Sequence, residues 1–472
     1  AVFKRIIQNC DFPLSSGPNK KPFMEFLIDI ARGLLGMFVL IGCCFLLSKN
    51  RKNIKWTMVL KGLLIQLILA IFILKGAEMA TFWAPLGWPK IFFSWISSFF
   101  VVVLDFTTAG AEFIFGDLAK SPGMEGSIGN FFAFQVLPTI VFFASVTAIL
   151  YHYGILQWVV KYMAKGMQKV LGTSGAESLS VISNIFVGQT EGPLVIKPYI
   201  KNMTPSELLA VMTGGMATIA GGVMAAYVQM LGNSYSLANN VSLEVGRLMF
   251  AEQLLGASLM AAPAALVIAK ILYPEDQIPE TQSGAKMTIE RPDANGIDAA
   301  ASGAKLGLKL AANVGAMLLA FIALLAMGNF FLYHFGELTG LNALLPGADL
   351  KIETILGWVF APIAFLIGVP WEDAVNMGSL IGTKIVLNEF VAYLQLADLV
   401  GESTLSPKTI TMATFALCGF ANFASIAIQI GGIGGLAPNR KSDIARFGMI
   451  AVLAGTFANL MTATIAGVLV GA

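Results

Sequence analysis

The 472-residue chain is 56% hydrophobic and only 12% charged. Soluble globular proteins carry about 25% charged residues, so this chain lacks the polar surface that it would need to face water on all sides. Thirty basic and 28 acidic residues leave a net charge of +2, which argues against a surface for nucleic acid. Two histidines and four cysteines are too few for a Cys/His metal centre or a disulfide scaffold. The composition predicts an all-α polytopic protein embedded in a lipid bilayer.

The first 22 residues are polar and contain Pro13, Gly17 and Pro18. No cleavable signal peptide is evident in them. We interpret residues 1–22 as a polar tail, which is either native or added ahead of a chain that starts naturally at Met24.

Eight apolar runs have the length of about 20 residues that a helix needs to cross a bilayer. They lie near 26–48, 57–75, 131–153, 206–230, 249–272, 309–332, 409–430 and 446–470. The stretches 77–128, 174–200 and 354–398 are also apolar, but Gly, Pro and polar residues break them. The pattern therefore predicts eight transmembrane helices.

The positions of Lys and Arg predict the orientation, because basic loops stay on the cytoplasmic side. The basic groups are Lys49, Arg51, Lys52 and Lys55; Lys161, Lys165 and Lys169; Lys197 and Lys201; and Arg440, Lys441 and Arg446. They share one side only if the N-terminus lies outside and 174–200 enters and leaves from the cytoplasm. The connection 273–304 then lies inside, and both chain ends lie outside.

Segment 174–200 cannot be an ordinary span, because four polar side chains and a Gly-Pro pair lie at its centre. Non-helical backbone at membrane depth is tolerated only where protein or a wet cavity covers it. We therefore predict a re-entrant hairpin with its tip at 189–191. The segment 371–398 has the same character, with its tip at 388–389, and enters from the opposite side.

Each hairpin precedes a span that glycines and hydroxyls interrupt, at 217–222 and at 419–425. A helix, a hairpin, a broken helix and a helix therefore occur twice in opposite orientations, a pattern typical of secondary transporters. The predicted divisions are N-terminal scaffold helices with an external interfacial region over 23–130, a first repeat over 131–272, a cytoplasmic connection over 273–304 and a second repeat over 305–472.

Glu191 and Glu389 are the best candidates for function, because an ionisable group inside a bilayer is costly and each lies at a hairpin tip. The alternative for each is to cap the N-terminus of a half-helix. Gln189 offers a carbonyl and two amide N–H groups, while an ionised Glu191 only accepts. Together these two suit a planar neutral ligand such as a nucleobase.

The opposite tip suits a polyhydroxyl group such as ribose. It offers Asn388 and Glu389, together with Asn422 and Ser425 one helical turn apart on one face. For Asn422 and Ser425 the alternative is hydrogen bonding between helices, which membrane proteins use routinely.

Asn184, Thr218 and the carbonyls around them form an all-oxygen set of the kind that a hard alkali cation prefers. The Thr218 hydroxyl has an alternative, which is to bond to its own helix. Lys384, in the second hairpin, either pairs with a carboxylate or extends its charge to the membrane surface. Nothing in the sequence assembles a nucleophile, a base and an orienting group, so an enzyme is not expected.

Several strings resemble the concentrative nucleoside transporter family, in family order across about 185–440. They are Asn184-Ile-Phe-Val-Gly-Gln-Thr-Glu191 with Pro193, Lys197-Pro-Tyr199, Thr218-Ile-Ala-Gly221, Asn313-Val-Gly-Ala-Met317, Gly368-Val-Pro-Trp371, Asn388-Glu-Phe-Val-Ala-Tyr393, and Cys418-Gly-Phe-Ala-Asn422 continuing to Ser425 and Gly431-Gly432. These motifs are too long and too many to match by chance.

The resemblance implies a homotrimer in which each protomer has its own binding site, a scaffold domain and a transport domain that moves like an elevator. The substrate contacts that it implies are Gln189, Thr190, Glu191 and Val223 around the base, Glu389, Asn422 and Ser425 at the ribose, and Phe420 and Leu310 in the cavity wall. The sodium ligands that it implies are the Asn184 side chain and carbonyl, the Val187 and Ile219 carbonyls and the Thr218 hydroxyl.

The sequence departs from the family at Gly192, where alanine is common, and at Thr218, where some bacterial relatives have serine. Proton-coupled relatives have Gln-Ser-Glu at the first tip and lack the Ile-Ala-Gly continuation, so this chain resembles the sodium branch. We predict a sodium-coupled symporter that imports nucleosides across the bacterial cytoplasmic membrane. The alternatives are a proton-coupled nucleoside transporter and another ion-coupled elevator transporter for a different small polar solute.

Overall fold

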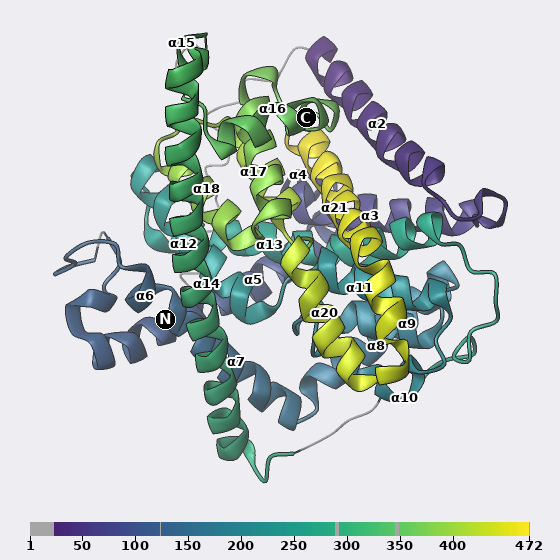
Figure 1. Cartoon of the computed structure of the whole chain (residues 1–472). Coiled ribbons are helices and arrows are strands. Elements are labelled where there is room, and N and C mark those ends of the chain that lie inside the picture. Colours follow the sequence, from purple (N-terminus) through teal and green to yellow (C-terminus); the bar gives the residue numbers. More distant parts are fainter. Residues whose placement is uncertain (1–22, 123, 288–291, 345–348, 472) are drawn as a thin grey trace.

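The computed structural model describes residues 23–122, 124–287, 292–344 and 349–471 (Figure 1). Within these ranges the regular structure is helical throughout, with no strand, so the predicted all-α class is confirmed. The predicted tail, residues 1–22, lies outside the described residues.

The helices before the first hairpin are α2 (Phe23–Leu46), α3 (Trp56–Leu74), α4 (Gly76–Phe82), α5 (Trp88–Phe115), α6 (Phe132–Gln135), α7 (Leu137–His152) and α8 (Ile155–Leu171). The rest of the first repeat contains α9 (Gly175–Ser183), the short helices η4 (Gly192–Ile196) and α10 (Lys197–Ile200), then α11 (Pro205–Ala217), α12 (Gly221–Asn239) and α13 (Leu243–Leu272). The second half contains α14 (Gly296–Thr339), α15 (Leu341–Leu344), α16 (Ile352–Leu366), α17 (Ala374–Val386), α18 (Glu389–Gly401), α19 (Pro407–Leu417), α20 (Phe423–Leu436) and α21 (Lys441–Gly471).

Eight helical segments of the described residues are long and apolar enough to cross a membrane. Seven of them coincide with predicted spans, and the eighth, Ala84–Ala119, contains α5. The stretch 77–128 is divided, as predicted, into α4, a 3-10 turn, α5 and a second 3-10 turn. The prediction missed that α5 alone is long enough to cross, because Pro89 lies in its first turn, where a helix needs no backbone N–H donor. The predicted span 409–430 is absent from the set because residues 418–422 divide it into α19 and α20.

The loops that carry the basic groups gather at one end of the molecule. Hydrogen bonds join the loop after α2 to the end of α13 (Lys49 N to Leu272 O, 2.9 Å), the start of α9 to the connection after α13 (Gly175 N to Thr281 O, 2.9 Å), and the segment before α21 to the turn before α11 (Arg440 Nη1 to Met203 O, 2.6 Å). The first hairpin therefore begins at this end.

The second hairpin begins at the other end, where α2 starts. The contacts there are Lys408 Nζ to Asp29 Oδ1 at 2.7 Å, Arg32 Nη2 to Val369 O at 2.7 Å, and Ser406 Oγ to Asp373 Oδ2 at 2.6 Å. Because α2 runs between the two ends, the two hairpins start from opposite ends of the molecule. Their re-entry into a membrane from opposite sides stays a prediction.

Helices α11 to α13 and α21 are largely buried, whereas most residues of α2, α3, α5, α7 and α14 are half-buried or exposed. The long helix α14 runs along one side of the molecule, and α2 lies on another flank (Figure 1). Small residues let α14 approach α7 closely: a Cβ on Gly303 would lie 2.7 Å from the Ala148 Cβ, and one on Gly307 would lie 2.8 Å from the Ala144 Cβ. The α7–α14 pair forms a wall beside the hairpins.

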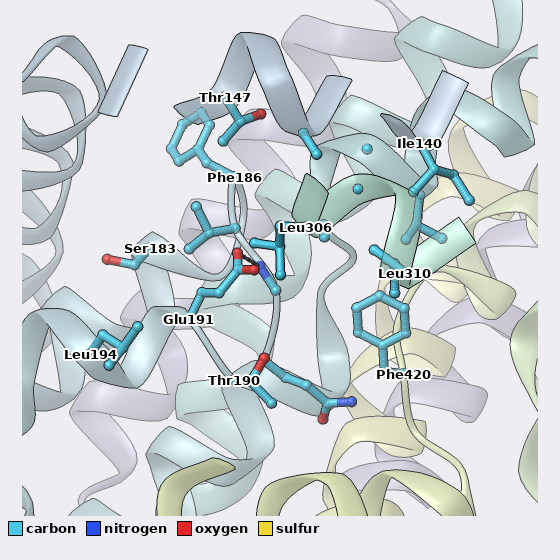
Figure 2. A pocket seen from close by; sticks show the side chains of 18 of the residues that line it. Ile140, Thr147, Ser183, Phe186, Thr190, Glu191, Leu194, Leu306, Leu310 and Phe420 are labelled. Atoms are coloured by element: carbon cyan, nitrogen blue, oxygen red, sulfur yellow. Dashed lines mark hydrogen bonds between the residues drawn. The ribbon is translucent and has the colours of Figure 1, made fainter. Parts of the chain in front are cut away.

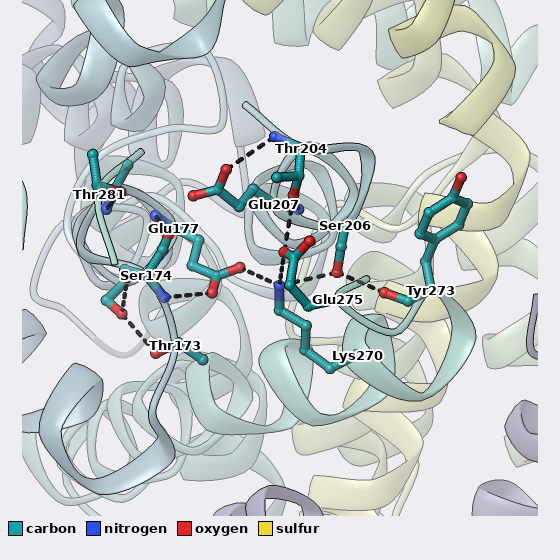
Figure 3. A network of polar contacts seen from close by, with 12 residues as sticks. Thr173, Ser174, Glu177, Thr204, Ser206, Glu207, Lys270, Tyr273, Glu275 and Thr281 are labelled. Atoms are coloured by element: carbon teal, nitrogen blue, oxygen red, sulfur yellow. Dashed lines mark hydrogen bonds and ion pairs between the residues drawn. The ribbon is translucent and has the colours of Figure 1, made fainter. Parts of the chain in front are cut away.

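A buried ionic network fixes the starts of α9 and α11 to α13 (Figure 3). Capping boxes begin these two helices at Ser174 and Thr204. The Lys270 Nζ lies 2.8 Å from Glu177 Oε2 and 3.3 Å from Glu275 Oε2, and Thr204 Oγ1 donates to Glu275 Oε2 at 2.9 Å. The first hairpin, α11 and α13 are thereby held together as one unit.

We predict that Lys270→Met destabilises the protein by about 3–5 kcal/mol, because it leaves the Glu177 carboxylate buried without its partner. Thermal unfolding of the purified protein in detergent measures the effect. Lys201→Met is the control, since Lys201 is exposed at the same end. Equal unfolding temperatures for the two variants would contradict the role given to the network.

Candidate functional site

A cavity of about 520 Å³ lies between the two hairpin tips, the broken helices and the α7–α14 wall. All nine residues predicted to contact substrate line it: Gln189, Thr190, Glu191, Val223, Leu310, Glu389, Phe420, Asn422 and Ser425. Of the predicted sodium ligands, Val187 also lines the cavity, whereas Asn184, Thr218 and Ile219 lie outside its lining. The fold therefore gathers one polar site from residues of both repeats.

The first tip is a tight turn that presents Glu191 to the cavity. The Gly188 carbonyl accepts hydrogen bonds from the backbone N–H of Glu191 and of Gly192, at 3.0 and 2.9 Å. In return, the Gly188 N–H donates to Glu191 Oε2 at 3.2 Å (Figure 2). Glu191 thus caps the turn of its own tip, and no side-chain bond from it caps the short helix that follows.

The second tip holds its carboxylate differently. Asn388 caps α18, with its Oδ1 accepting from the Val391 N–H at 2.9 Å, so the capping role considered for Glu389 belongs to Asn388. Glu389 is the first residue of α18 and only 6% exposed. Its Oε1 accepts from the Tyr227 hydroxyl at 3.1 Å, and its Oε2 accepts from Asn422 Nδ2 at 2.8 Å. The carboxylate is thus fixed by one donor from each broken helix.

Hydrogen bonds continue from this carboxylate to the first tip. Asn422 caps α20, with its Oδ1 accepting from the Ser425 N–H at 2.9 Å. The Ser425 hydroxyl accepts from Gln189 Nε2 at 3.1 Å, although the two residues are 236 positions apart. Asn422 and Ser425 therefore do form hydrogen bonds to other segments of the chain, which is the alternative considered for them. These bonds join the two tips and leave each side chain in the cavity lining.

Sequence reasoning missed two residues that orient the tips, Tyr227 and Gln429. Gln429 Nε2 donates to Gln189 Oε1 at 3.1 Å and to Met212 O at 2.9 Å, and its side chain is fully buried. Its position four residues after Ser425, on the same face of α20, was the available signal. Tyr227 lies within the long apolar helix α12, and nothing in its local sequence indicates a carboxylate partner.

Apolar side chains complete the cavity. Figure 2 shows Thr190 and Glu191 on one side, with Leu310 of α14 and Phe420 of the second helix break on the other. Val223, in the first turn of α12, also lines the cavity. Flat apolar surface beside a few fixed polar groups is the usual composition of a small-molecule site.

The predicted ion ligands surround the break after α11. Asn184 is 1% exposed, and neither oxygen nor nitrogen of its side-chain amide has a hydrogen-bond partner among the described residues. Gly192 leaves room for this amide, since a Cβ there would lie 1.9 Å from Asn184 Oδ1. The Thr218 hydroxyl donates to Gly214 O at 2.8 Å, as the alternative for it predicts, and its oxygen lone pairs remain available. A buried amide oxygen without a donor suits a cation.

Lys384 does not extend to the membrane surface, and its interaction with a carboxylate is limited to an attraction to Glu389 without a direct contact. Its side chain is 2% exposed, so it does not reach a membrane surface. Its Nζ donates to the Ala416 carbonyl and to Asn459 Oδ1, each at 2.8 Å, and not to a carboxylate. Among the described residues, no group of three or more His, Cys, Asp or Glu side chains could hold a metal ion.

Two helical hairpins that begin at opposite ends and meet at one cavity with a cluster of fixed polar groups define a membrane transporter rather than an enzyme. Residues 35–118 match the family described as Na+ dependent nucleoside transporter N-terminus, residues 133–234 match nucleoside recognition (Gate), and residues 253–467 match Na+ dependent nucleoside transporter C-terminus. The chain belongs to the family of concentrative, Na+-dependent nucleoside transporters.

Individual relatives match over nearly their full length. The chain is 46% identical to YutK, an uncharacterized transporter of Bacillus subtilis, over 94% of this chain and 100% of that protein. It is 41% identical to the nucleoside permease NupC of Helicobacter pylori, over 93% of this chain and 97% of the permease. The solved structure of CNTnw in an inward-facing substrate-bound state is 43% identical, with a TM-score of 0.81 over 94% of this chain and 98% of that chain.

Proposed function

We propose that this nucleoside transporter is a sodium-coupled symporter that imports nucleosides across the bacterial cytoplasmic membrane by an elevator-type movement. The observation that carries the proposal is the hydrogen-bonded junction of the two hairpin tips around one cavity. Homology to proteins named sodium/nucleoside cotransporter 1, 38% identical in the mouse, supports sodium as the ion.

The first tip would bind the base. The Gln189 amide already bonds to Ser425 and Gln429, and it retains one N–H and one oxygen lone pair for a ligand. Glu191 adds a carboxylate acceptor, and Thr190 adds a hydroxyl that acts directly or through water. Together these groups match the mixed donors and acceptors at the edge of a base, while Val223 packs against its face.

The second tip would bind the ribose. The Glu389 oxygens accept hydrogen bonds from Tyr227 and Asn422, and a carboxylate has further lone pairs for the hydroxyls of a sugar. Asn388 also lines the cavity, and its Nδ2 has no partner among the described residues. Asn422 and Ser425 are held at the same wall, and Leu310 and Phe420 would cover the apolar face of the nucleoside.

The co-transported sodium would bind at the break after α11, to the Asn184 side chain and carbonyl, the Val187 and Ile219 carbonyls and the Thr218 hydroxyl. The backbone already joins this break to the hairpin, since the Gly221 N–H donates to Phe186 O at 3.2 Å. An ion held here would order the chain on both sides of 184–191. Nucleoside affinity would then depend on sodium.

The cavity supports a cytoplasm-facing assignment for this structure. Besides the polar site, its lining includes Tyr151 in the last turn of α7 and Gln157 at the start of α8, together with Met287 and Asp293 in the connection before α14. The connection 273–304 is predicted to be cytoplasmic. Transport would move the hairpins and broken helices past the α7–α14 wall, and the exposed apolar surface of the scaffold helices would contact lipid and the neighbouring subunits of a homotrimer.

Sodium coupling supplies enough free energy to concentrate a neutral solute. One positive charge moving down a potential of 100 mV releases about 2.3 kcal/mol, which corresponds to about a fiftyfold concentration ratio before the sodium gradient itself is counted. A passive channel, by contrast, equilibrates the solute.

We predict that uptake of labelled uridine or adenosine into proteoliposomes requires an inward sodium gradient. Accumulation should collapse when potassium replaces sodium on both sides. A proton gradient applied without sodium is the matched comparison, since it would drive a proton-coupled relative. Equal uptake in potassium, or uptake driven by protons alone, would contradict sodium coupling.

We also predict that Glu389→Gln abolishes measurable ribonucleoside uptake, with a loss of at least about tenfold, because hydrogen bonds to a charged group are the stronger ones. Glu402→Gln is the control, since Glu402 is exposed at the far end of the same hairpin. Near-normal transport by Glu389→Gln would remove this carboxylate from the sugar site.

A further inference from the structure

The second repeat places a buried lysine where the first repeat places a candidate ion ligand. Asn184 precedes Ala217, the last residue of α11, and Lys384 precedes Leu417, the last residue of α19, by the same 33 positions. Asn184 follows the first helix of its hairpin, and Lys384 lies in the last turn of the equivalent helix. Counted from the ends of α11 and α19, Lys384 therefore occupies in the second repeat the position of Asn184 in the first.

The Lys384 ammonium reaches the carboxyl end of a broken helix. The carbonyl that it contacts, Ala416 O, lies in the last turn of α19. Carbonyls in the last turn of a helix have no partner within the helix, and they form the negative end of the helix dipole. Half-helices in transporters use such carbonyls to hold an alkali cation. Lys384 therefore brings a covalently attached positive group to a place that favours a cation.

Asn459 of α21 extends this contact to the first repeat. Its Oδ1 accepts from Lys384, and its Nδ2 donates at 2.7 Å to the carbonyl of Ala217, the last residue of α11. The two helix breaks lie close together, since a Cβ on Gly419 would lie 2.6 Å from Ala217 O. One lysine and one asparagine therefore bridge the carboxyl ends of both broken helices.

We propose that Lys384 is a tethered cation, which replaces in the second repeat the exchangeable sodium ion of the first. It is a positioning residue, because it does not line the cavity. Lys384 orients the second hairpin tip through the helix break at 418–422, because the last residue of that break, Asn422, donates a hydrogen bond to Glu389. This inference rests on the proposed sodium site at Asn184. The consequence is an asymmetric pair of tips: the second is held permanently, and the first is ordered only when sodium binds.

Two substitutions at one position test this proposal, because both remove the ammonium but only one supplies an oxygen ligand. The purified full-length protein, its variants Lys384→Met and Lys384→Asn, and the control Lys61→Met are titrated with uridine or adenosine by calorimetry over a range of sodium concentrations. Lys61 is exposed on α3. Unfolding temperatures are recorded for each.

Lys384→Met is expected to weaken nucleoside binding at least about tenfold at every sodium concentration, as the loss of a charge-assisted hydrogen bond implies. Lys384→Asn is expected to be equally weak at low sodium and to regain affinity as sodium rises, more steeply than the wild type. A second sodium ion, bound by the asparagine and the Ala416 carbonyl, would replace the lost ammonium. Lys61→Met should match the wild type.

A further variant, Asn459→Leu, keeps the lysine and its contact with Ala416 O, but removes both the Asn459 acceptor of Lys384 and the bridge to Ala217. It should weaken nucleoside binding and leave the steepness of the sodium response unchanged, which keeps the proposal testable if the lysine variants do not fold. Wild-type affinity in Lys384→Met, identical sodium responses of the Met and Asn variants, or a steeper sodium response in Asn459→Leu would overturn this inference alone. Sodium-independent binding by the wild type would overturn the proposed function together with it.

Discussion

The cavity depends on one chain of hydrogen bonds between the hairpin tips, which come from different repeats. It runs from Tyr227 to Glu389, through Asn422 and Ser425, to Gln189, and it ends at Gln429. Leaving a buried polar group without its partner costs about 1–3 kcal/mol, so neither tip shifts alone without a penalty. The chain also orients each side chain before a ligand arrives, so less ordering is left for binding.

Much of this site could be predicted from the sequence, because a membrane makes polar residues conspicuous. Glu191 and Glu389 stand out in apolar surroundings, and the glycines at 217–222 and 419–425 mark the helix breaks. The two hairpins and their inverted order follow from these signals together with the positions of Lys and Arg. The contacts described above place both tips at one cavity.

The partners of these residues could not be predicted in the same way. Gln429 and Tyr227 each lie within an apolar helix, and the carboxamide or carboxylate that they contact belongs to a distant part of the chain. The role of Lys384 depends on Asn459, which is 75 positions away. A local pattern gives the period of a helix, but not which helix it packs against. The continuity of α5 was missed for a different reason. Its proline suggested a break, but a proline in the first turn of a helix removes no hydrogen bond of that helix.

The central claim is that an ion at the first helix break orders the tip that binds the nucleoside. Thermodynamic linkage then requires the nucleoside to strengthen sodium binding by the same factor by which sodium strengthens nucleoside binding. Calorimetric titrations of the purified protein, with nucleoside at several fixed sodium concentrations and with sodium at several fixed nucleoside concentrations, measure both factors. The account predicts two equal factors, each well above one. A nucleoside affinity that is the same in sodium and in potassium would contradict it.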